Sequence, residues 1–126
     1  MRVSRRAALA AVLAALALPA AASAKPLKVA LLVPGHANDG SFNQVAAEAI
    51  KSLAAEGAVT FELRESMADP SKSEPIIRQY AASGYDLIIG HGIELSEPIL
   101  KIAASFPKAH FAASGGPDLA GRLLPN

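Results

Sequence analysis

The stretch LLVPGHANDGSFNQ, residues 31–44, decides how this chain can fold. It begins inside the run of residues 28–33, which is continuously apolar after Lys28 and is typical of a strand buried on both faces of a parallel sheet. Pro34 and Gly35 close that run, and a helical pattern of apolar residues begins at Ser41. A buried strand that passes through a glycine-containing turn into a helix indicates an α/β fold.

The helix that follows is predicted to start at Ser41 and to stop at Gly57. Ser41 with Gln44 three residues later is a capping-box pattern, in which the serine side chain caps the helix. Helical spacing predicts one buried stripe, formed by Phe42, Val45, Ala46, Ala49, Leu53 and Ala54. On spacing alone, Phe42 is a core residue.

Strands and helices alternate along the rest of the chain. Ser73 is the predicted cap of the second helix, because Pro75 fits only in a first turn. The other predicted elements are strands at 59–65, 85–89 and 110–114 and helices ending at Gly84 and spanning 96–106. Alternation with short connections predicts a parallel sheet with helices on both faces.

Three of the predicted strands end in glycine-rich turns, PGHANDGS (34–41), GHG (90–92) and SGGPD (114–118). Ligands of open α/β sheets lie beyond the carboxyl ends of the strands. Because those ends meet at one edge of a parallel sheet, we expect the three turns to form a single rim that holds a ligand.

The first residues have the features of a secretory signal. Arginines at positions 2, 5 and 6 precede the apolar run AALAAVLAALALPAAA, and Ala22-Ser23-Ala24 is a small-residue cleavage site, so we expect cleavage before Lys25. The run is shorter than the roughly 20 apolar residues of a spanning helix, which argues against an anchor. Ser4-Arg5-Arg6 resembles part of a twin-arginine signal, but the pattern is incomplete and favours the general secretory route.

Composition excludes several classes of function. Three of the twelve basic residues would leave with the signal, so nine would stand against eleven acidic ones, which gives no electrostatic footprint for nucleic acid. The sequence has no cysteine, which excludes disulfides, thiolate metal sites, a cysteine nucleophile and a lipid-modified cysteine. We therefore expect residues 25–126 to form one modest soluble domain beyond the inner membrane, without stable membrane insertion.

The rim residues do not suit phosphate binding. Gly35 and Gly40 have the glycine spacing of a phosphate-binding loop, but Ser41 follows directly, so the lysine that contacts terminal phosphates is missing. Asp39 also places a negative charge where phosphate oxygens would lie. No cofactor is expected.

Hydrolysis and neutral-ligand binding remain as alternatives. His36, His91, Ser41 and Asp39 could supply a base, nucleophile and orienter, although no G-x-S-x-G elbow occurs. The third histidine, His110, lies within a strand, and the three lack metal-ligand spacing. Phe42 beside Asn43 would instead suit a planar heterocycle or a sugar, by stacking and hydrogen bonding. From the residues alone, Phe42 remains either core or pocket, and His91 either a pocket donor or a solvated loop residue.

Two blocks resemble a known family. KVALLVPGHANDGSFNQVAAEAIKSL is similar to the opening of the basic membrane protein (BMP, PnrA-like) family of ABC transporter substrate-binding proteins, whose signature places an aspartate close before Ser-Phe-Asn. GYDLIIGHGIELSEPILKIAASFPKAHFAAS is similar to the family's second block. The resemblance implies a Rossmann-like N-terminal lobe of a type I periplasmic-binding protein. Residues 25–126 would be that lobe, incomplete and without the second lobe.

The resemblance also implies a function and a site. The chain would be the periplasmic solute-binding component of an ABC importer, working with permease and ATPase subunits and binding a purine-nucleoside-like or other small polar ligand without catalysis. Phe42 would stack on the base, Asn43 would bond to it, and Asp39 and Ser41 would cap the helix and shape the turn. His91 and Gly92 would complete the ligand-binding set.

Two positions depart from the family pattern. Gly115 stands where many relatives have an aspartate that contacts the base, and Ile93 stands where many have an aromatic residue. The ligand therefore stays open. The main alternative is a small secreted α/β hydrolase-like enzyme that uses the rim histidines and aspartate, and a flavodoxin-like interaction domain is a third possibility.

Overall fold

The computed structural model describes residues 24–115. The signal peptide predicted for residues 1–24 therefore lies, except for Ala24, outside the described residues, as does the turn predicted after Gly115. Within the described part, four parallel strands form one sheet in the order β2-β1-β3-β4. Their bounds are Leu27–Leu32 (β1), Val59–Arg64 (β2), Leu87–His91 (β3) and His110–Ser114 (β4).

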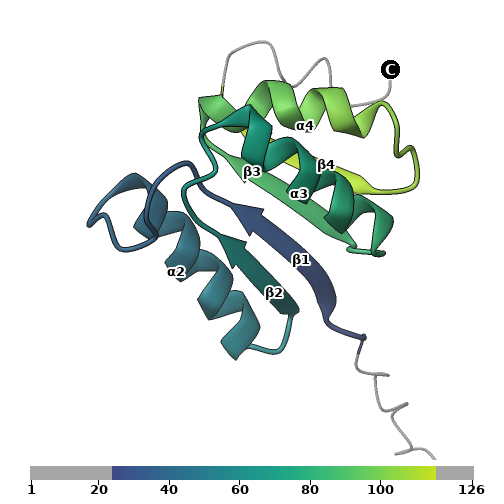
Figure 1. Cartoon of the computed structure of the whole chain (residues 1–126). Coiled ribbons are helices and arrows are strands. Elements are labelled where there is room, and N and C mark those ends of the chain that lie inside the picture. The colour runs from purple at the N-terminus through teal and green to yellow at the C-terminus, as the bar shows by residue number, and fades with distance from the viewer. Residues whose placement is uncertain (1–23, 116–126) are drawn as a thin grey trace, which may run out of the picture.

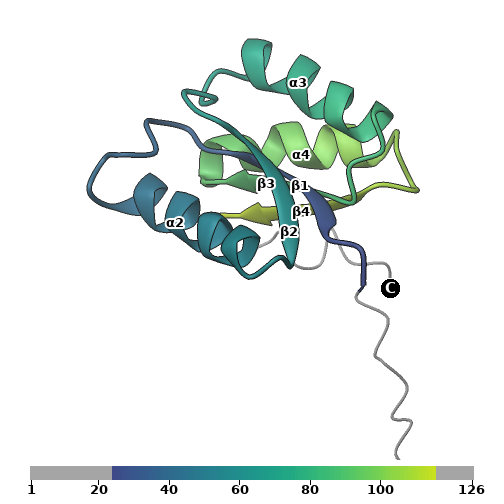
Figure 2. The ribbon, with the colours of Figure 1, turned by 90° about the horizontal axis from the view of Figure 1, so that it is seen from below.

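Helices cover both faces of this sheet, as predicted (Figure 1). Helix α2, Phe42–Ala55, lies beside β2 on one face, and α3, Pro70–Ala82, and α4, Ser96–Ala103, lie together on the other (Figure 2). A short 3-10 helix, η2 at Ile93–Leu95, leads directly into α4. The predicted α/β class is confirmed.

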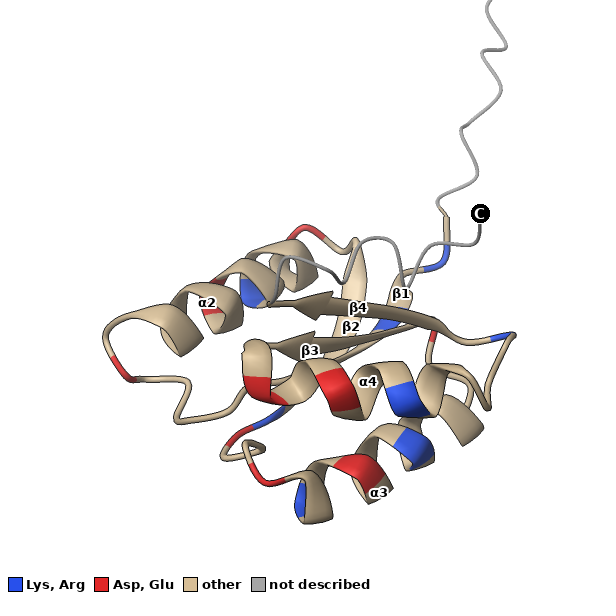
Figure 3. Ribbon diagram, turned by 90° about the horizontal axis from the view of Figure 1, so that it is seen from above, with Lys and Arg blue, Asp and Glu red and all other residues tan. Residues whose placement is uncertain are grey.

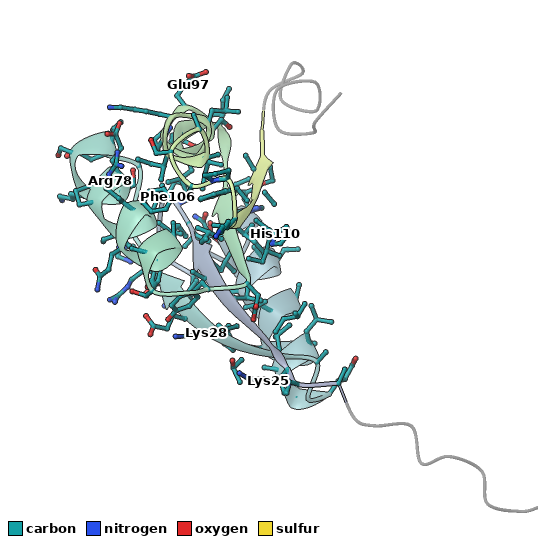
Figure 4. The ribbon with its side chains drawn as sticks, turned by 90° about the vertical axis from the view of Figure 1, so that its right-hand side faces the viewer. Lys25, Lys28, Arg78, Glu97, Phe106 and His110 are labelled. Atoms are coloured by element: carbon teal, nitrogen blue, oxygen red, sulfur yellow. The ribbon has the colours of Figure 1, made fainter. Side chains whose placement is uncertain are left out.

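The larger part of the core lies between the sheet and the α3–α4 layer. Its buried residues are Ala30, Leu32, Ile77, Tyr80, Tyr85, Ile88, Leu95, Ile99 and Ile102. Along the outside of this layer, the Arg78 guanidinium of α3 lies 5.9 Å from the centre of the Phe106 ring, just beyond α4 (Figure 4). This contact helps to hold the two helices side by side.

The face that carries α2 is less completely covered. Its buried residues are Val29, Leu31, Val33, Ile50 and Val59. On β3, Leu87 and Ile89 point to the same face, since they pair with Val29 and Leu31, but both are only half-buried. Helix α2 lies nearest to β2, so it leaves the β3 side of this face partly open (Figure 2).

The stripe predicted for the first helix is wrong in its orientation. The helix buries Asn43, Ala47 and Ile50, whereas Val45 is 67% exposed and Phe42 is 51% exposed. Either set of residues has helical spacing, so the sequence pattern admits two faces separated by a rotation about the helix axis. The structure selects the face that begins with Asn43.

The predicted start of the second helix is also wrong. Helix α3 begins at Pro70, and the Asp69 carboxylate caps it by accepting a hydrogen bond of 2.8 Å from the Ser71 backbone nitrogen. Ser73 is fully buried within the helix, and Pro75 lies inside it. A proline at the first helical position is as favourable a start as the one predicted at Pro75.

The third strand begins and ends two residues later than predicted, at Leu87–His91 instead of 85–89. Gly90 and His91 belong to β3 rather than to a turn, where they pair with Ala113 and Ser114 of β4. A side chain at position 90 would meet Ile99 Cγ1 at 2.7 Å and Leu95 Cβ at 2.9 Å. Gly90 therefore serves close packing of helix on strand, and it places His91 on a rigid element.

The orientation of α2 yields a stability prediction. Ile50→Ala should lower the free energy of unfolding by about 2–5 kcal/mol, because it removes a buried side chain from the core. Val45→Ala, on the exposed face of the same helix, should change it by less than about 0.5 kcal/mol. Urea denaturation of both variants checks this, and a larger effect at Val45 would contradict the observed orientation.

Candidate functional site

The turn between β1 and α2 is organised by the Asp39 carboxylate. It accepts hydrogen bonds from the backbone nitrogens of Ser41 (2.9 Å) and Gln44 (3.1 Å). It also accepts bonds from the backbone nitrogen (3.1 Å) and the side-chain nitrogen (2.9 Å) of Asn43. The backbone N–H of Ser41, followed by those of Asn43 and Gln44, holds the pKa of Asp39 below its ordinary value. Asp39 therefore caps α2, as the family resemblance implied.

The capping box predicted at Ser41 does not form. Ser41 occupies the N-cap position, but its side chain makes no capping hydrogen bond. The Gln44 side chain reaches back, as in a capping box, but it accepts from the backbone nitrogen of Gly40 (3.0 Å). Asp39 already bonds the N–H groups that a serine cap would take.

Asn43 lies behind the rim and is only 7% exposed. Its side-chain nitrogen must be the atom that faces Asp39, because a carboxylate only accepts. Its Oδ1 atom is buried without a hydrogen-bond partner. A Cβ at Gly35 would come within 2.7 Å of the Asn43 amide nitrogen, so the glycine is what admits this amide.

Phe42 and His91 come together from α2 and β3. Their rings stack with centroids 3.9 Å apart and an interplanar angle of 22°. His91 Nε2 lies 3.1 Å from the Phe42 carbonyl oxygen, and His91 Nδ1 lies 2.8 Å from Ser114 Oγ on β4. His91 thus links three elements of the rim, and it covers one face of the Phe42 ring.

Gly92 follows β3 with a φ of 107°, a region that favours glycine. A Cβ at this position would meet Glu94 Oε2 at 2.9 Å and Pro34 Cγ at 3.1 Å. The Gly92 N–H is shared between the carbonyl oxygen (3.2 Å) and Oγ (3.1 Å) of Ser114. This sharing fastens the end of β4 to the turn after β3.

These residues surround an open hollow of about 650 Å³ at the carboxyl ends of the strands. Its volume falls within the range of small-molecule sites. It is lined by Pro34, Gly35, Phe42, Asn43, Ala68, Gly92, Ile93, Glu94, Ser114 and Gly115. The described residues of the three turns predicted to share one rim, with Ser114 and Gly115 for the third, therefore do so.

Of the six residues predicted as ligand-binding, Phe42, Asn43 and Gly92 line this hollow. Asp39, Ser41 and His91 lie just behind it, in the turn and against the Phe42 ring. Sequence reasoning missed Glu94 and Ser114. Ser114 could have been found as the last residue of a strand that ends at the rim, whereas Glu94 depends on the 3-10 turn that follows Gly92.

Gly115 leaves no room for a side chain. A Cβ built on it would lie 2.8 Å from both the backbone nitrogen and Cα of Ile93. The Gly115 carbonyl oxygen accepts a hydrogen bond of 3.1 Å from the Ser96 hydroxyl at the start of α4. The backbone after β3 therefore occupies the space that a larger residue would need here.

The hollow carries a weakly acidic character. Glu94 is the one charged residue among those that line it, and no lysine or arginine does so in the described part of the chain. Acidic residues also occur in the loops at this end of the sheet (Figure 3). The site therefore suits a neutral or cationic ligand better than an anion.

The hydrolytic arrangement considered from the sequence is not assembled. Both ring nitrogens of His91 bond to Phe42 and Ser114, so neither bonds to Ser41, and Asp39 is engaged as a helix cap. His110 lies at the other end of the sheet, exposed on the edge strand β4 (Figure 4). Within residues 24–115, no three His, Asp or Glu side chains are placed to hold a metal ion.

Comparison with known families identifies the family of this chain. Residues 27–118 match the family model described as ABC transporter substrate-binding protein PnrA-like (Bmp). The chain belongs to this family. The match includes both blocks on which the resemblance was based, and it runs from the start of β1 past the end of β4.

Solved structures of similar proteins agree with the PnrA-like assignment. An ABC transporter solute-binding protein from Conexibacter woesei is 53% identical, with a TM-score of 0.74, over 79% of this chain and 33% of that one. One from Aeropyrum pernix is 28% identical, with a TM-score of 0.65, over 74% of this chain and 26% of that one. The chain thus spans between a quarter and a third of the length of these relatives.

A third similar structure shows that the same architecture occurs under a different description. A transcriptional activator of the comK gene from Bacillus halodurans is 28% identical, with a TM-score of 0.60, over 71% of this chain and 30% of that one. No match was found among curated proteins. In the described part of this PnrA-like chain, no helix is long and apolar enough to cross a membrane.

The Asp39 cap yields a pH-dependent prediction. Because the folded pKa of Asp39 lies below its ordinary value of 3.8, its ionised form stabilises the fold at neutral pH. That contribution is lost as the pH falls through the folded pKa. Asp39→Asn should therefore lower the urea midpoint at neutral pH, and the difference from the unmodified chain should shrink below pH 3.8.

Glu48→Gln is the matched control for this experiment. Glu48 lies exposed on α2 and accepts only from the Gln44 side chain (2.6 Å). We expect its urea midpoint to follow that of the unmodified chain at every pH. An Asp39→Asn difference that does not change with pH would show that the charge of Asp39 is not what stabilises the turn.

Proposed function

We propose that this chain is the N-terminal ligand-binding lobe of a solute-binding component of an ABC importer, and that its ligand is purine-nucleoside-like or another small polar molecule. The observation that carries the proposal is the half-exposed Phe42 ring on the wall of an open hollow that no basic residue lines. Membership of the PnrA-like family supports the transport role. No catalytic step is involved.

The ligand would stack on Phe42. His91 already covers one face of that ring, so the other face is the one open to a planar base. An aromatic ring held by a neighbour loses little freedom on binding, which makes it a better platform than a mobile side chain. Asn43 and Gly92 would contribute contacts from the wall. Asp39 and His91 hold the wall in place, and Ser41 donates its backbone N–H to the Asp39 carboxylate.

The cellular setting is part of the proposal. A signal peptide at residues 1–24, cleaved before Lys25, would deliver the protein to the periplasm, where it would pass its ligand to a permease driven by an ATPase. Without a cysteine, the protein would not be lipid-anchored. Neither nucleic acid nor a cofactor would take part.

Residues 25–126 would supply one wall of a site that closes between two lobes. A ligand held from one side keeps much of its surface in water, so its affinity is low. We expect millimolar to high-micromolar binding by the chain as given, about 4–6 kcal/mol at most. Sub-micromolar affinity for adenosine, guanosine or inosine in calorimetry would contradict this half-site description.

The role of Phe42 can be tested by NMR titration with these three nucleosides. Phe42→Ala should reduce binding below detection, because stacking on an aromatic side chain contributes about 1–3 kcal/mol per base. Val45→Ala, one turn further along α2 and not among the residues that line the hollow, is the matched control and should bind like the unmodified chain. Equal binding by both variants would refute the stacking role.

The charge of the hollow predicts a preference for nucleosides over nucleotides. Adenosine should bind about fivefold more tightly than AMP, because Glu94 and a phosphate repel by about 1 kcal/mol at contact distance in water. Glu94→Gln should narrow this ratio, whereas Glu48→Gln on the outer side of α2 should not. Titrations with both ligands measure the ratio, and tighter binding of AMP by the unmodified chain would contradict the prediction.

A further inference from the structure

A series of hydrogen bonds at the rim begins at a group that can only accept and ends at a group that can only donate. At one end, the Phe42 carbonyl oxygen lies 3.1 Å from His91 Nε2, and a carbonyl oxygen can only accept. At the other end, the Gly92 backbone nitrogen lies 3.1 Å from Ser114 Oγ, and a backbone N–H can only donate. His91 and Ser114 stand between these ends, joined by a contact of 2.8 Å.

The carbonyl end fixes the tautomer of His91. Since the Phe42 oxygen accepts, the proton of the neutral imidazole must lie on Nε2. Nδ1 then carries a lone pair, and its contact with Ser114 requires the serine hydroxyl to donate. The stack on the Phe42 ring holds the imidazole in this orientation.

The Ser114 hydroxyl is thereby left with one free hydrogen-bonding position. Its one proton is directed to His91 Nδ1, and one of its two lone pairs receives the Gly92 N–H. One lone pair remains. Ser114 lines the hollow and is exposed, so this lone pair is available to a ligand.

We infer that Ser114, oriented by the neutral imidazole of His91, is a specificity-determining residue that offers a bound solute a hydrogen-bond acceptor and no donor. This inference rests on the proposed function and deepens it. The Glu94 carboxylate on the same hollow is also only an acceptor when ionised. The site therefore selects solutes rich in N–H and O–H donors, such as a nucleoside with an amino group and sugar hydroxyls.

The orientation of the two side chains can be measured without a ligand. Nitrogen-15 NMR of the full chain in mildly alkaline buffer should show His91 protonated on Nε2 and unprotonated on Nδ1. The Ser114 hydroxyl proton should be slow to exchange and should show a nuclear Overhauser effect to the imidazole Hε1. A proton on Nδ1 would overturn the inference, because the hydroxyl would then be free to donate.

Selectivity is tested with adenosine and analogues that each lack one donor: purine riboside, which lacks the amino group, and the 2′-, 3′- and 5′-deoxy forms. In the unmodified chain, removal of the donor that faces Ser114 should weaken binding by about threefold to tenfold. In Ser114→Ala, removal of that same donor should have no effect. Ser114→Thr keeps the hydroxyl and should restore the selectivity.

The outcomes separate this inference from the proposed function. If Ser114→Ala weakens every analogue equally, or none, Ser114 does not determine specificity, although the chain still binds nucleosides. If no nucleoside binds to the unmodified chain, the nucleoside ligand of the proposed function fails, and the specificity role fails with it. A donor-dependent loss that threonine rescues supports both.

Discussion

The structure of the rim depends on one carboxylate. Asp39 collects the first free N–H groups of α2 and the amide of Asn43 at the same time. By holding Asn43 inward, it fixes the rotation of the helix about its axis. Phe42, one position earlier, must then point toward the rim instead of into the core. A local capping interaction thus decides which aromatic surface the protein presents.

The remaining walls of the hollow depend on close approach of the backbone. Gly90 admits Ile99 of α4 against β3, Gly92 turns the chain past Pro34, and Gly115 lies against the backbone of Ile93. Each of these glycines removes a side chain at a different contact. Together they bring the ends of three strands close enough for His91 to reach both Phe42 and Ser114.

The fold was predictable because its signals are redundant. Apolar runs, helix spacing and glycine stops all indicated an alternating α/β chain with a common rim, and the structure confirms this. The orientation of α2 was not predictable from spacing, since the stripe that begins with Phe42 and the face that begins with Asn43 both recur at helical intervals. Spacing ignores the side-chain hydrogen bonds of Asp39, and these select between the two.

The start of α3 and the parts played by Ser114 and Glu94 were missed for a related reason. Asp69 and Ser73 are both residue types that cap helices and both precede a proline, and in the structure it is Asp69 that takes the cap position. Ser114 acquires its role through His91, 23 residues away in sequence, by the register of β3 with β4. Such pairings arise from strand register, which a residue-by-residue pattern does not contain.

The two helical layers bury unequal numbers of core residues against the sheet, and this has a consequence for dynamics. Helices α3 and α4 share a continuous core, whereas α2 is held by a narrow face around Ala47 and Ile50. Regions with fewer buried apolar contacts open at lower free energy than the rest of a domain. The first turn of α2 carries both Phe42 and Asn43, so local detachment of this helix would dismantle the proposed ligand wall while the α3–α4 layer stays folded. A solute that stacks on Phe42 would therefore slow amide hydrogen exchange along α2 well beyond the residues that it touches.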